Sequence, residues 1–204
     1  MIDEGYIKFR SEWTRTAPLV HDQILTLVRW RKPLYDAGLI GCIAGTDIGF
    51  GNISVRAGMP GQFIISGTRT GCLEELGAEH FSLVTGYALD TNTVRCSGAA
   101  EASSEAMTHA ALYDIDSQIR AVVHIHSEQL WAELRSSLPA TQSSVAYGTP
   151  QMALELHRLY RESAFPQTGI AVMTGHEGGL IGFGNSMQQA AEKMLSLARN
   201  VAND

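Results

Sequence analysis

The feature of this sequence that most limits its fold is the alternation of short apolar runs with segments of helical periodicity. Twenty glycines lie mostly between these runs, where glycine marks turns rather than element interiors. The apolar runs are strand-length, as in Phe63-Ile64-Ile65, and too short to span a bilayer. Alternating helices and strands predict an α/β fold. The length of 204 residues suits one domain, residues 1–204, with a substantial core.

Segments with apolar residues at helical spacing, or with high helix propensity, are predicted to be helices. They cover residues 19–37, 101–113, 128–134, 150–161 and 186–197. Ser127 and Thr149 are expected to cap the third and fourth of these helices. Pro33 should kink or split the first.

Short runs of β-branched and other apolar residues predict strands. They cover residues 53–56, 62–66, 81–87, 119–125, 169–174 and 180–183, and the last two runs are expected to pair. No predicted helix separates the early strands, so the sheet is expected to be mixed or partly antiparallel.

Composition and charge exclude several classes of protein. Hydrophobic residues make up 45% of the chain and charged residues 18%, which is too apolar for a disordered chain. The net charge of −6 lacks the positive footprint of a nucleic-acid-binding protein. Residues 1–4 are acidic and contain no apolar stretch, so neither a signal peptide nor a membrane partner is predicted.

The number and spacing of the cysteines indicate the cellular compartment in which the protein is expected. The three cysteines, Cys42, Cys72 and Cys96, are scattered and form no CxxC pair. This pattern predicts neither a disulfide framework nor a thiolate zinc site. A reducing cytoplasm is the expected location.

The sharpest local feature is His124-Ile125-His126 at the end of an apolar run. In a strand, side chains at i and i+2 leave the same face, so both imidazoles can converge while Ile125 points to the opposite face. Nitrogen ligands on a strand suit zinc and other divalent metals. The alternative is a pair of histidines with ordinary hydrogen bonds, because an HxH motif alone is weak.

A second feature is Ser103-Ser104-Glu105, which opens a predicted helix. The two hydroxyls either satisfy free backbone N–H groups as caps or help to bind an anion at the positive helix end. Glu105 could then serve as a metal ligand or a general base. His109 lies one helical turn later and is expected to support Glu105 by a hydrogen bond.

Small polar residues also follow or open two of the predicted strands. Asn52 belongs to the stretch 51–56, and Ser66 and Gly67 end another strand. Alone these stretches indicate turns, but together with the serines they could form one oxyanion pocket. His176 lies in a glycine-rich turn after an apolar strand, where a lone histidine is more often structural than a ligand.

Six motifs in order make the sequence similar to a known family. They are GNISVR at 51–56, ISG at 65–67, SSE at 103–105, AVVHIHS at 121–127, YGTP at 147–150 and the GH turn at 175–176. From about Leu19 onward, the chain resembles the class II aldolase/adducin family, which includes fuculose-phosphate aldolases and methylthioribulose-phosphate dehydratases.

The resemblance implies a three-layer α/β/α fold with a central, mainly antiparallel sheet. It also implies a divalent metal, usually zinc, and commonly a homotetramer with the site at a subunit boundary. The implied metal ligands are His124, His126, His176 and, at rest, Glu105. The implied phosphate pocket comprises Asn52, Ser66, Gly67, Ser103 and Ser104.

The function implied by the resemblance is that of a metal-dependent lyase, an aldolase or a dehydratase. Its substrate would be a small, phosphorylated hydroxycarbonyl compound or sugar, reacting through a metal-stabilised enediolate, with Glu105 moving the proton. One alternative is a sugar-phosphate 4-epimerase, in which aspartate tends to replace Glu105. Another is a non-catalytic, adducin-like binding domain, which lacks the metal histidines that this chain keeps.

The chain also departs from the family pattern. Glu177 follows His176, where the family usually has glycine, and it is expected to point to solvent. Gly49 stands where a threonine often precedes the GN motif. The tyrosine acid of the aldolases has no clear counterpart, and Tyr147 is left without a role.

Overall fold

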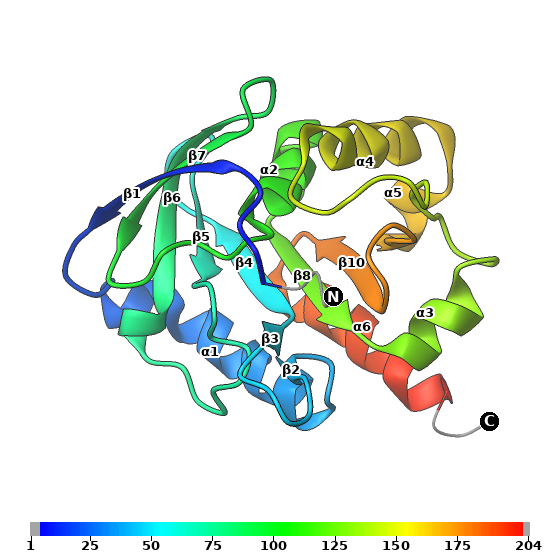
Figure 1. Ribbon diagram of the computed structural model, residues 1–204, viewed down its shortest axis with the longest axis horizontal. Helices are drawn as coiled ribbons and strands as arrows, with labels where there is room; N and C mark the ends of the chain where they lie inside the picture. The colour runs from blue at the N-terminus through cyan, green and yellow to red at the C-terminus, as the bar shows by residue number, and fades with distance from the viewer. Residues whose placement is uncertain (1–4, 202–204) are drawn as a thin grey trace.

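The fold is built around one large, mixed β-sheet (Figure 1). The computed structural model describes residues 5–201, and in this part of the chain eight strands run in the order β1-β7-β6-β5-β4-β8-β10-β9. Strands β1 and β7 are parallel, and every other neighbouring pair is antiparallel. The strands are β1 (Arg10–Arg15), β4 (Asn52–Arg56), β5 (Phe63–Ser66), β6 (Phe81–Ala88), β7 (Thr93–Gly98), β8 (Ala121–His126), β9 (Ile170–Val172) and β10 (Gly179–Gly184).

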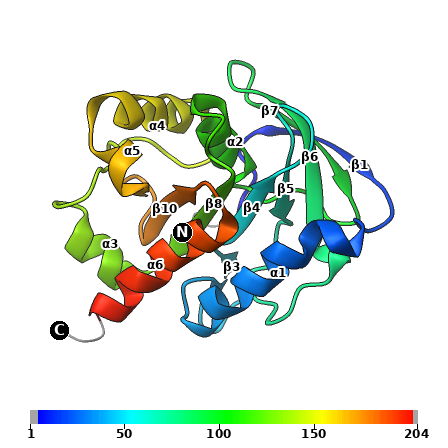
Figure 2. The same cartoon turned by 180° about the vertical axis from the view of Figure 1, so that it is seen from behind.

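Helices cover both faces of this sheet. The helices are α1 (His21–Asp36), α2 (Ala106–Ile115), α3 (Glu128–Leu134), α4 (Pro150–Glu162), α5 (Phe165–Thr168) and α6 (Met187–Val201), with a 3₁₀ turn η1 at Ala78–His80. Helices α1 and α6 lie on one face (Figure 2). Helices α2 and α4 pack on the other face. The predicted α/β/α layers and the mainly antiparallel sheet are therefore confirmed.

Strand β8 shows how the sequence divides the core between the two faces. Val123 and Ile125 join the apolar cluster under α1 and α6. Val122 joins the cluster under α2 and α4. Because side chains alternate along a strand, His124 and His126 lie on the α2 and α4 side of the sheet. Ile125 points to the opposite face, as the spacing predicts.

Two predicted helices differ from the observed ones. Helix α2 begins at Ala106, so the predicted helix 101–113 starts too early; Ser103 instead forms a turn in which its carbonyl accepts from the N–H of Ala106. Helix α1 continues through Pro33 to Asp36, so the proline does not split it. Pro33 lies in the last turn, where the missing backbone donor interrupts little of the helix.

Apolar patterning does not predict strands β1 and β7. The residues of β1 are mostly polar and exposed, because β1 forms an edge of the sheet and packs only lightly on the core. Strand β7 follows a turn closely and contains Arg95 and Ser97, which break the apolar pattern. Strand β7 lies inside the sheet, between β1 and β6, and most of its residues are buried. Its polar residues, and not exposure to solvent, therefore prevent its recognition by apolar patterning.

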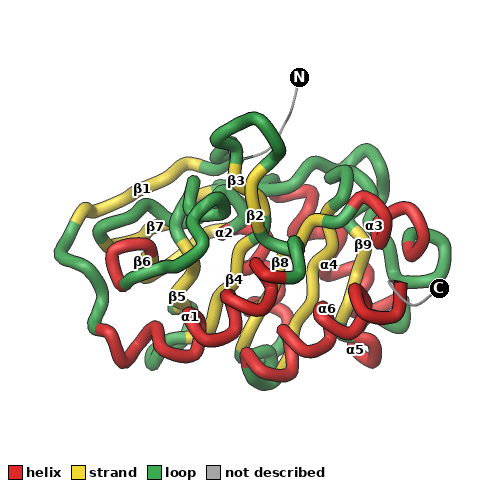
Figure 3. The backbone as a smooth tube through the Cα atoms, turned by 90° about the horizontal axis from the view of Figure 1, so that it is seen from below, coloured by secondary structure: helices red, strands yellow, loops and turns green. Residues whose placement is uncertain are grey.

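A second, two-stranded sheet pairs β2 (Gly41–Cys42) with β3 (Gly49–Phe50). The loop between them projects from the body of the molecule (Figure 3). Gly71, in the loop after β5, lies so close to this sheet that a Cβ there would approach the carbonyl oxygen of Gly41 to 2.7 Å. Glycine is therefore required for this close approach.

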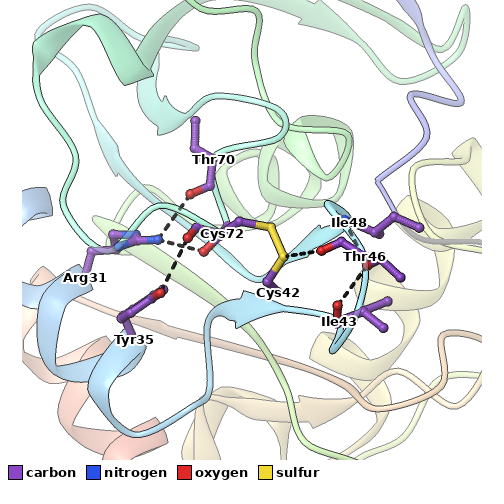
Figure 4. Close-up of a disulfide and its surroundings, with 9 residues drawn as sticks. Arg31, Tyr35, Cys42, Ile43, Thr46, Ile48, Thr70 and Cys72 are labelled. Atoms are coloured by element: carbon purple, nitrogen blue, oxygen red, sulfur yellow. Dashed lines mark hydrogen bonds between the residues drawn. A yellow bond between two sulfur atoms is a disulfide. The ribbon is translucent and has the colours of Figure 1, made fainter.

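The expectation that the chain has no disulfide is wrong. The contact at Gly71 brings the Cα atoms of Cys42 and Cys72 to 4.5 Å, and their sulfur atoms are bonded (Figure 4). These cysteines are 30 residues apart, so sequence spacing gives no sign of the pair. Cys96 is buried and free.

Helix α1 holds the same loop from its other side. The guanidinium of the buried Arg31 donates to the carbonyls of Thr70 and Gly71 (Figure 4) and to that of Glu74. Burial lowers the pKa of Arg31 to about 10, which still leaves it charged at neutral pH. The three carbonyls of the loop thus accept hydrogen bonds from the charged guanidinium of Arg31. These bonds hold the loop against helix α1.

Across residues 5–201, none of the helices combines the length and the apolar character needed to cross a lipid bilayer.

Candidate functional site

Three imidazoles from distant parts of the chain meet at one end of the sheet. His124 and His126 project from β8, and His176 lies in the turn between β9 and β10. Donor atoms of the three residues all lie within 4.8 Å of one another. Strand pairing sets this arrangement, because His126 is opposite Gly179 at the start of β10. A Cβ on Gly179 would lie 3.2 Å from the rings of His124 and His176, so glycine lets the turn fold over His124.

The hydrogen bonds of His124 leave one ring nitrogen for the cluster. Nδ1 lies 3.0 Å from the carbonyl oxygen of Leu180, and since a carbonyl only accepts, this nitrogen is assigned the proton. In the neutral ring, the lone pair of Nε2 then faces Nε2 of His126 at 3.0 Å. Histidines that bind metals commonly donate their other ring N–H to a backbone carbonyl in this way.

The three imidazoles fit a divalent metal ion in ligand type, and the His124–His126 pair fits it in spacing. Nitrogens around a tetrahedral zinc ion, with bonds of about 2.0–2.1 Å, lie roughly 3.3 Å apart. The 3.0 Å separation between His124 and His126 is close to this value. Burial, and then the two neighbouring imidazoles, hold the pKa of His126 well below its usual value. A neutral imidazole keeps the lone pair that a metal requires.

Glu105 is the buried acid of the site. It occupies the N-cap position of α2 and is fully buried. Its Oε1 lies 3.2 Å from Nδ1 of His176 and 4.0 Å from Nε2 of His124. Burial alone would raise the pKa of Glu105, but the two imidazoles outweigh burial and lower this pKa to about 2. The carboxylate is therefore ionised beside the histidine cluster.

Tyr147 covers the cluster on the side of His176. Its ring stacks on the His176 ring at a centroid distance of 4.3 Å. The ammonium of Lys8 lies 3.7 Å from the centroid of the Tyr147 ring. The Tyr147 hydroxyl accepts from the N–H of Tyr6 and donates to its carbonyl. Its placement in the YGTP motif is the one sequence signal for this residue, whereas Lys8 has none.

A small polar pocket adjoins the histidines. Its volume is about 20 Å³, which is room for about one water molecule. It is lined by small or polar residues and one arginine, namely Gly5, Gly49, Gly51, Asn52, Gly67, Thr68, Arg69, Thr70, Gly71, Ser103 and Ser104. Four of the five residues predicted for a phosphate pocket therefore line one cavity. The fifth, Ser66, accepts instead from the backbone N–H of Ile53 and links β5 to β4.

Two further expectations concern residues beside the site. His109 bonds through Nδ1 to the hydroxyl of Ser54 at 2.7 Å, not to the carboxylate of Glu105, because the sheet lies on that side of α2. Burial first, and then His124, lower the pKa of His109 to about 3. Glu177 is exposed, as expected.

The geometry brings together a nitrogen-rich cation site, an ionised carboxylate and a polar pocket. Register places Asn52 of the pocket directly opposite His124. Ser104 of the pocket immediately precedes Glu105. The pocket is therefore linked to the histidine cluster through Asn52 and to the carboxylate through Ser104.

Comparisons with known proteins identify a family and a fold. The family model described as "Class II Aldolase and Adducin N-terminal domain" matches residues 44–202. No curated protein matches the sequence.

Solved structures share the fold at low sequence identity. YgbL from Klebsiella pneumoniae, a candidate aldolase/epimerase/decarboxylase, is 20% identical, with a TM-score of 0.64 and coverage of 91% of each chain. L-Fuculose-1-phosphate aldolase from Thermus thermophilus is 21% identical, with a TM-score of 0.59 over 85% of this chain and 88% of that one. A sugar-phosphate aldolase from Thermotoga maritima is 15% identical, with a TM-score of 0.65 over 87% and 91%.

Proposed function

The chain belongs to the class II aldolase and adducin family, and we propose that it is a divalent-metal-dependent lyase, an aldolase or a dehydratase. Its substrate is a small, phosphorylated hydroxycarbonyl compound. One observation carries the proposal: the imidazoles of His124, His126 and His176 face one another, with Glu105 against two of them. An adducin-like binding domain would have no need for this set of groups.

The roles of the residues follow from their chemistry. His124, His126 and His176 hold the ion, and Glu105 either joins them or stays beside them. A divalent ion held there supplies Lewis-acid stabilisation of negative charge on substrate oxygens. Glu105 takes a proton from the carbon next to the carbonyl group, because its carboxylate lies at the edge of the cluster, against two of the imidazoles. The polar pocket holds the far end of the substrate.

Two finer parts of the proposal rest on the family. Zinc is the proposed ion, although histidine and carboxylate ligands also suit manganese, iron and cobalt. A homotetramer is the proposed assembly.

Metal analysis tests the first step. The purified full chain, supplemented with zinc and then dialysed, should retain about one equivalent of metal. The His126→Ala variant should retain less than about a tenth of an equivalent, because it loses one of three nitrogen ligands. His21→Ala, which removes an exposed histidine of α1, is the matched control. Wild-type protein with less than a tenth of an equivalent would contradict the proposal.

A substrate panel tests the chemistry. Phosphorylated and non-phosphorylated hydroxyketones and hydroxyacids are incubated with the metal-loaded protein, and the products are identified by mass spectrometry. We expect cleavage or loss of water. Glu105→Gln should retain metal but lower turnover by about 10²–10⁴-fold, the usual contribution of a general base. Inversion at carbon 4 without cleavage would instead identify an epimerase.

A further inference from the structure

Arg69 places a positive charge at the polar pocket. Among the described residues that line the pocket, Arg69 is the charged one, and the others are glycine, serine, threonine and asparagine. Its side chain is exposed. Within residues 5–201 no carboxylate forms an ion pair with it. An unpaired guanidinium beside a pocket free of acidic groups favours an anion there.

The backbone of Arg69 has an uncommon conformation. Arg69 has a φ of 62°, in the left-handed region that residues other than glycine, asparagine and aspartate seldom adopt. The loop around it is fixed by Arg31 and by the disulfide at Cys72. These contacts therefore hold Arg69 in a backbone conformation that it would seldom adopt in an unrestrained loop.

A buried amide points independently to a ligand. Asn52 is only 7% exposed and lines the pocket. Its Oδ1 has no hydrogen-bond partner within the described part of the chain. A half-turn of the amide exchanges oxygen and nitrogen, so Asn52 can equally present an N–H₂ donor to an anion. A buried polar atom without a partner is costly, and a bound ligand would remove this cost.

We propose that Arg69 determines the specificity of the enzyme for substrates that carry an anionic group, a phosphate or a carboxylate. This inference rests on the proposed lyase function and adds to it the residue that recognises the charge. The pocket has room for about one oxygen-sized atom. One oxygen of the anion enters between Asn52, Ser103 and Ser104, and the remaining oxygens stay at the rim, where Arg69 binds them.

Anion titration of the metal-loaded full chain tests the proposal. Inorganic phosphate and acetate are titrated by calorimetry into wild type, Arg69→Gln and Arg161→Gln. Arg161 is an exposed arginine near the end of α4, so its variant controls for net charge. Anions that bind the metal do so equally in all three proteins, and the difference reports on the arginine.

We expect Arg69→Gln to weaken binding of at least one anion by about tenfold or more, as for loss of a charge-assisted hydrogen bond. Arg161→Gln should change the dissociation constant less than about twofold. Arg69→Lys should fall between wild type and Arg69→Gln, because it keeps the charge but loses the planar fork. The anion whose affinity depends on Arg69 identifies the group, phosphate or carboxylate.

A double-mutant cycle tests whether Arg69 and Ser104 contact the same ligand. Effects of Arg69→Gln and Ser104→Ala on anion affinity should be non-additive, since both residues contact one group. Equal effects of Arg69→Gln and Arg161→Gln, or a wild type that binds neither anion, would overturn the proposal. If either of these two results is found in protein that still binds metal, the Arg69 proposal fails but the proposed lyase function does not. Loss of metal binding with the Arg69 effect intact overturns the lyase function alone.

Discussion

The ring of the third histidine, His176, is oriented by its neighbours, and Tyr147 is the aromatic one outside the metal cluster. His176 lies in a turn, and its ring is stacked between those of His124 and Tyr147. Tyr147 is almost fully buried and is itself held by the backbone of Tyr6. Tyr147 is thus a positioning residue, which acts on the cluster through His176.

Replacement of Tyr147 should therefore weaken metal binding. We expect Tyr147→Leu to lower zinc affinity by about tenfold, because groups that orient ligands typically contribute about 10–100-fold. Competition with a chromogenic chelator measures this affinity. Tyr147→Phe keeps the stacked ring and is the matched control, with affinity close to wild type. Unchanged affinity in Tyr147→Leu would show that the turn orients His176 unaided.

At the scale of elements, helices α2 and α4 are joined by a hydrogen bond at their rim. The hydroxyl of Tyr160 in α4 donates to Oδ2 of Asp116, directly after α2, at 2.6 Å. This bond lowers the pKa of Asp116. Burial, and then Asp116, raise the pKa of Tyr160 to about 12.

The contribution of this bond should depend on pH in a defined direction. Because the pKa of Asp116 is lower in the folded state, its stabilisation is present above the unfolded value of about 3.9 and is lost as pH falls further. Tyr160, with a raised pKa, contributes below about pH 10 and loses its contribution as pH rises through about 12.

We therefore expect Tyr160→Phe to lower the free energy of unfolding by at most about 1 kcal/mol at pH 7, since Asp116 is only partly buried. The difference from wild type should shrink below pH 4. Urea denaturation at pH 7, 5, 4 and 3 measures it. Tyr6→Phe, with an exposed side chain, is the control. A difference that is constant from pH 7 to pH 3 would rule out the Asp116 bond as its origin.

Elements that bury one face are the predictable ones. Helix α4 begins at Pro150 with the Thr149 hydroxyl accepting from Met152 N–H, and α3 begins after Ser127 in the same way. Both predicted caps are confirmed. They can be predicted from the sequence because a cap is a contact between residues of one helical turn. Strand β1 escapes prediction, because an edge strand is stabilised by pairing with β7 rather than by its own side chains.

At the scale of the whole molecule, the disulfide joins the small β2–β3 sheet to the loop that lines the pocket. It closes a segment of 30 residues, which restricts the unfolded chain and stabilises the fold by about 3–4 kcal/mol. Cys72→Ser should lower the free energy of unfolding by about 2–4 kcal/mol. Cys96→Ala, at the free cysteine, is the control and should leave the disulfide's contribution in place.

Thiol titration in denaturant provides an independent measurement. Non-reduced wild-type protein should expose one thiol per chain, that of Cys96, and three after reduction. Three thiols without reduction would contradict the bond. The stability of wild type, but not of Cys72→Ser, should fall on addition of dithiothreitol.

The local spacing of residues is enough to predict that His124 and His126 share one face of a strand and that Ile125 lies on the other. Strand geometry fixes this over two residues, whatever the rest of the fold does. The motif resemblance names His176 as a third ligand, but contacts between distant segments are what bring its ring to the other two. The same kind of contact places Arg69 at the pocket beside Asn52 and joins Cys42 to Cys72. These contacts depend on strand register and on close approach of loops at glycines such as Gly71 and Gly179. Both arise from packing between segments far apart in the chain, about which local periodicity carries no information.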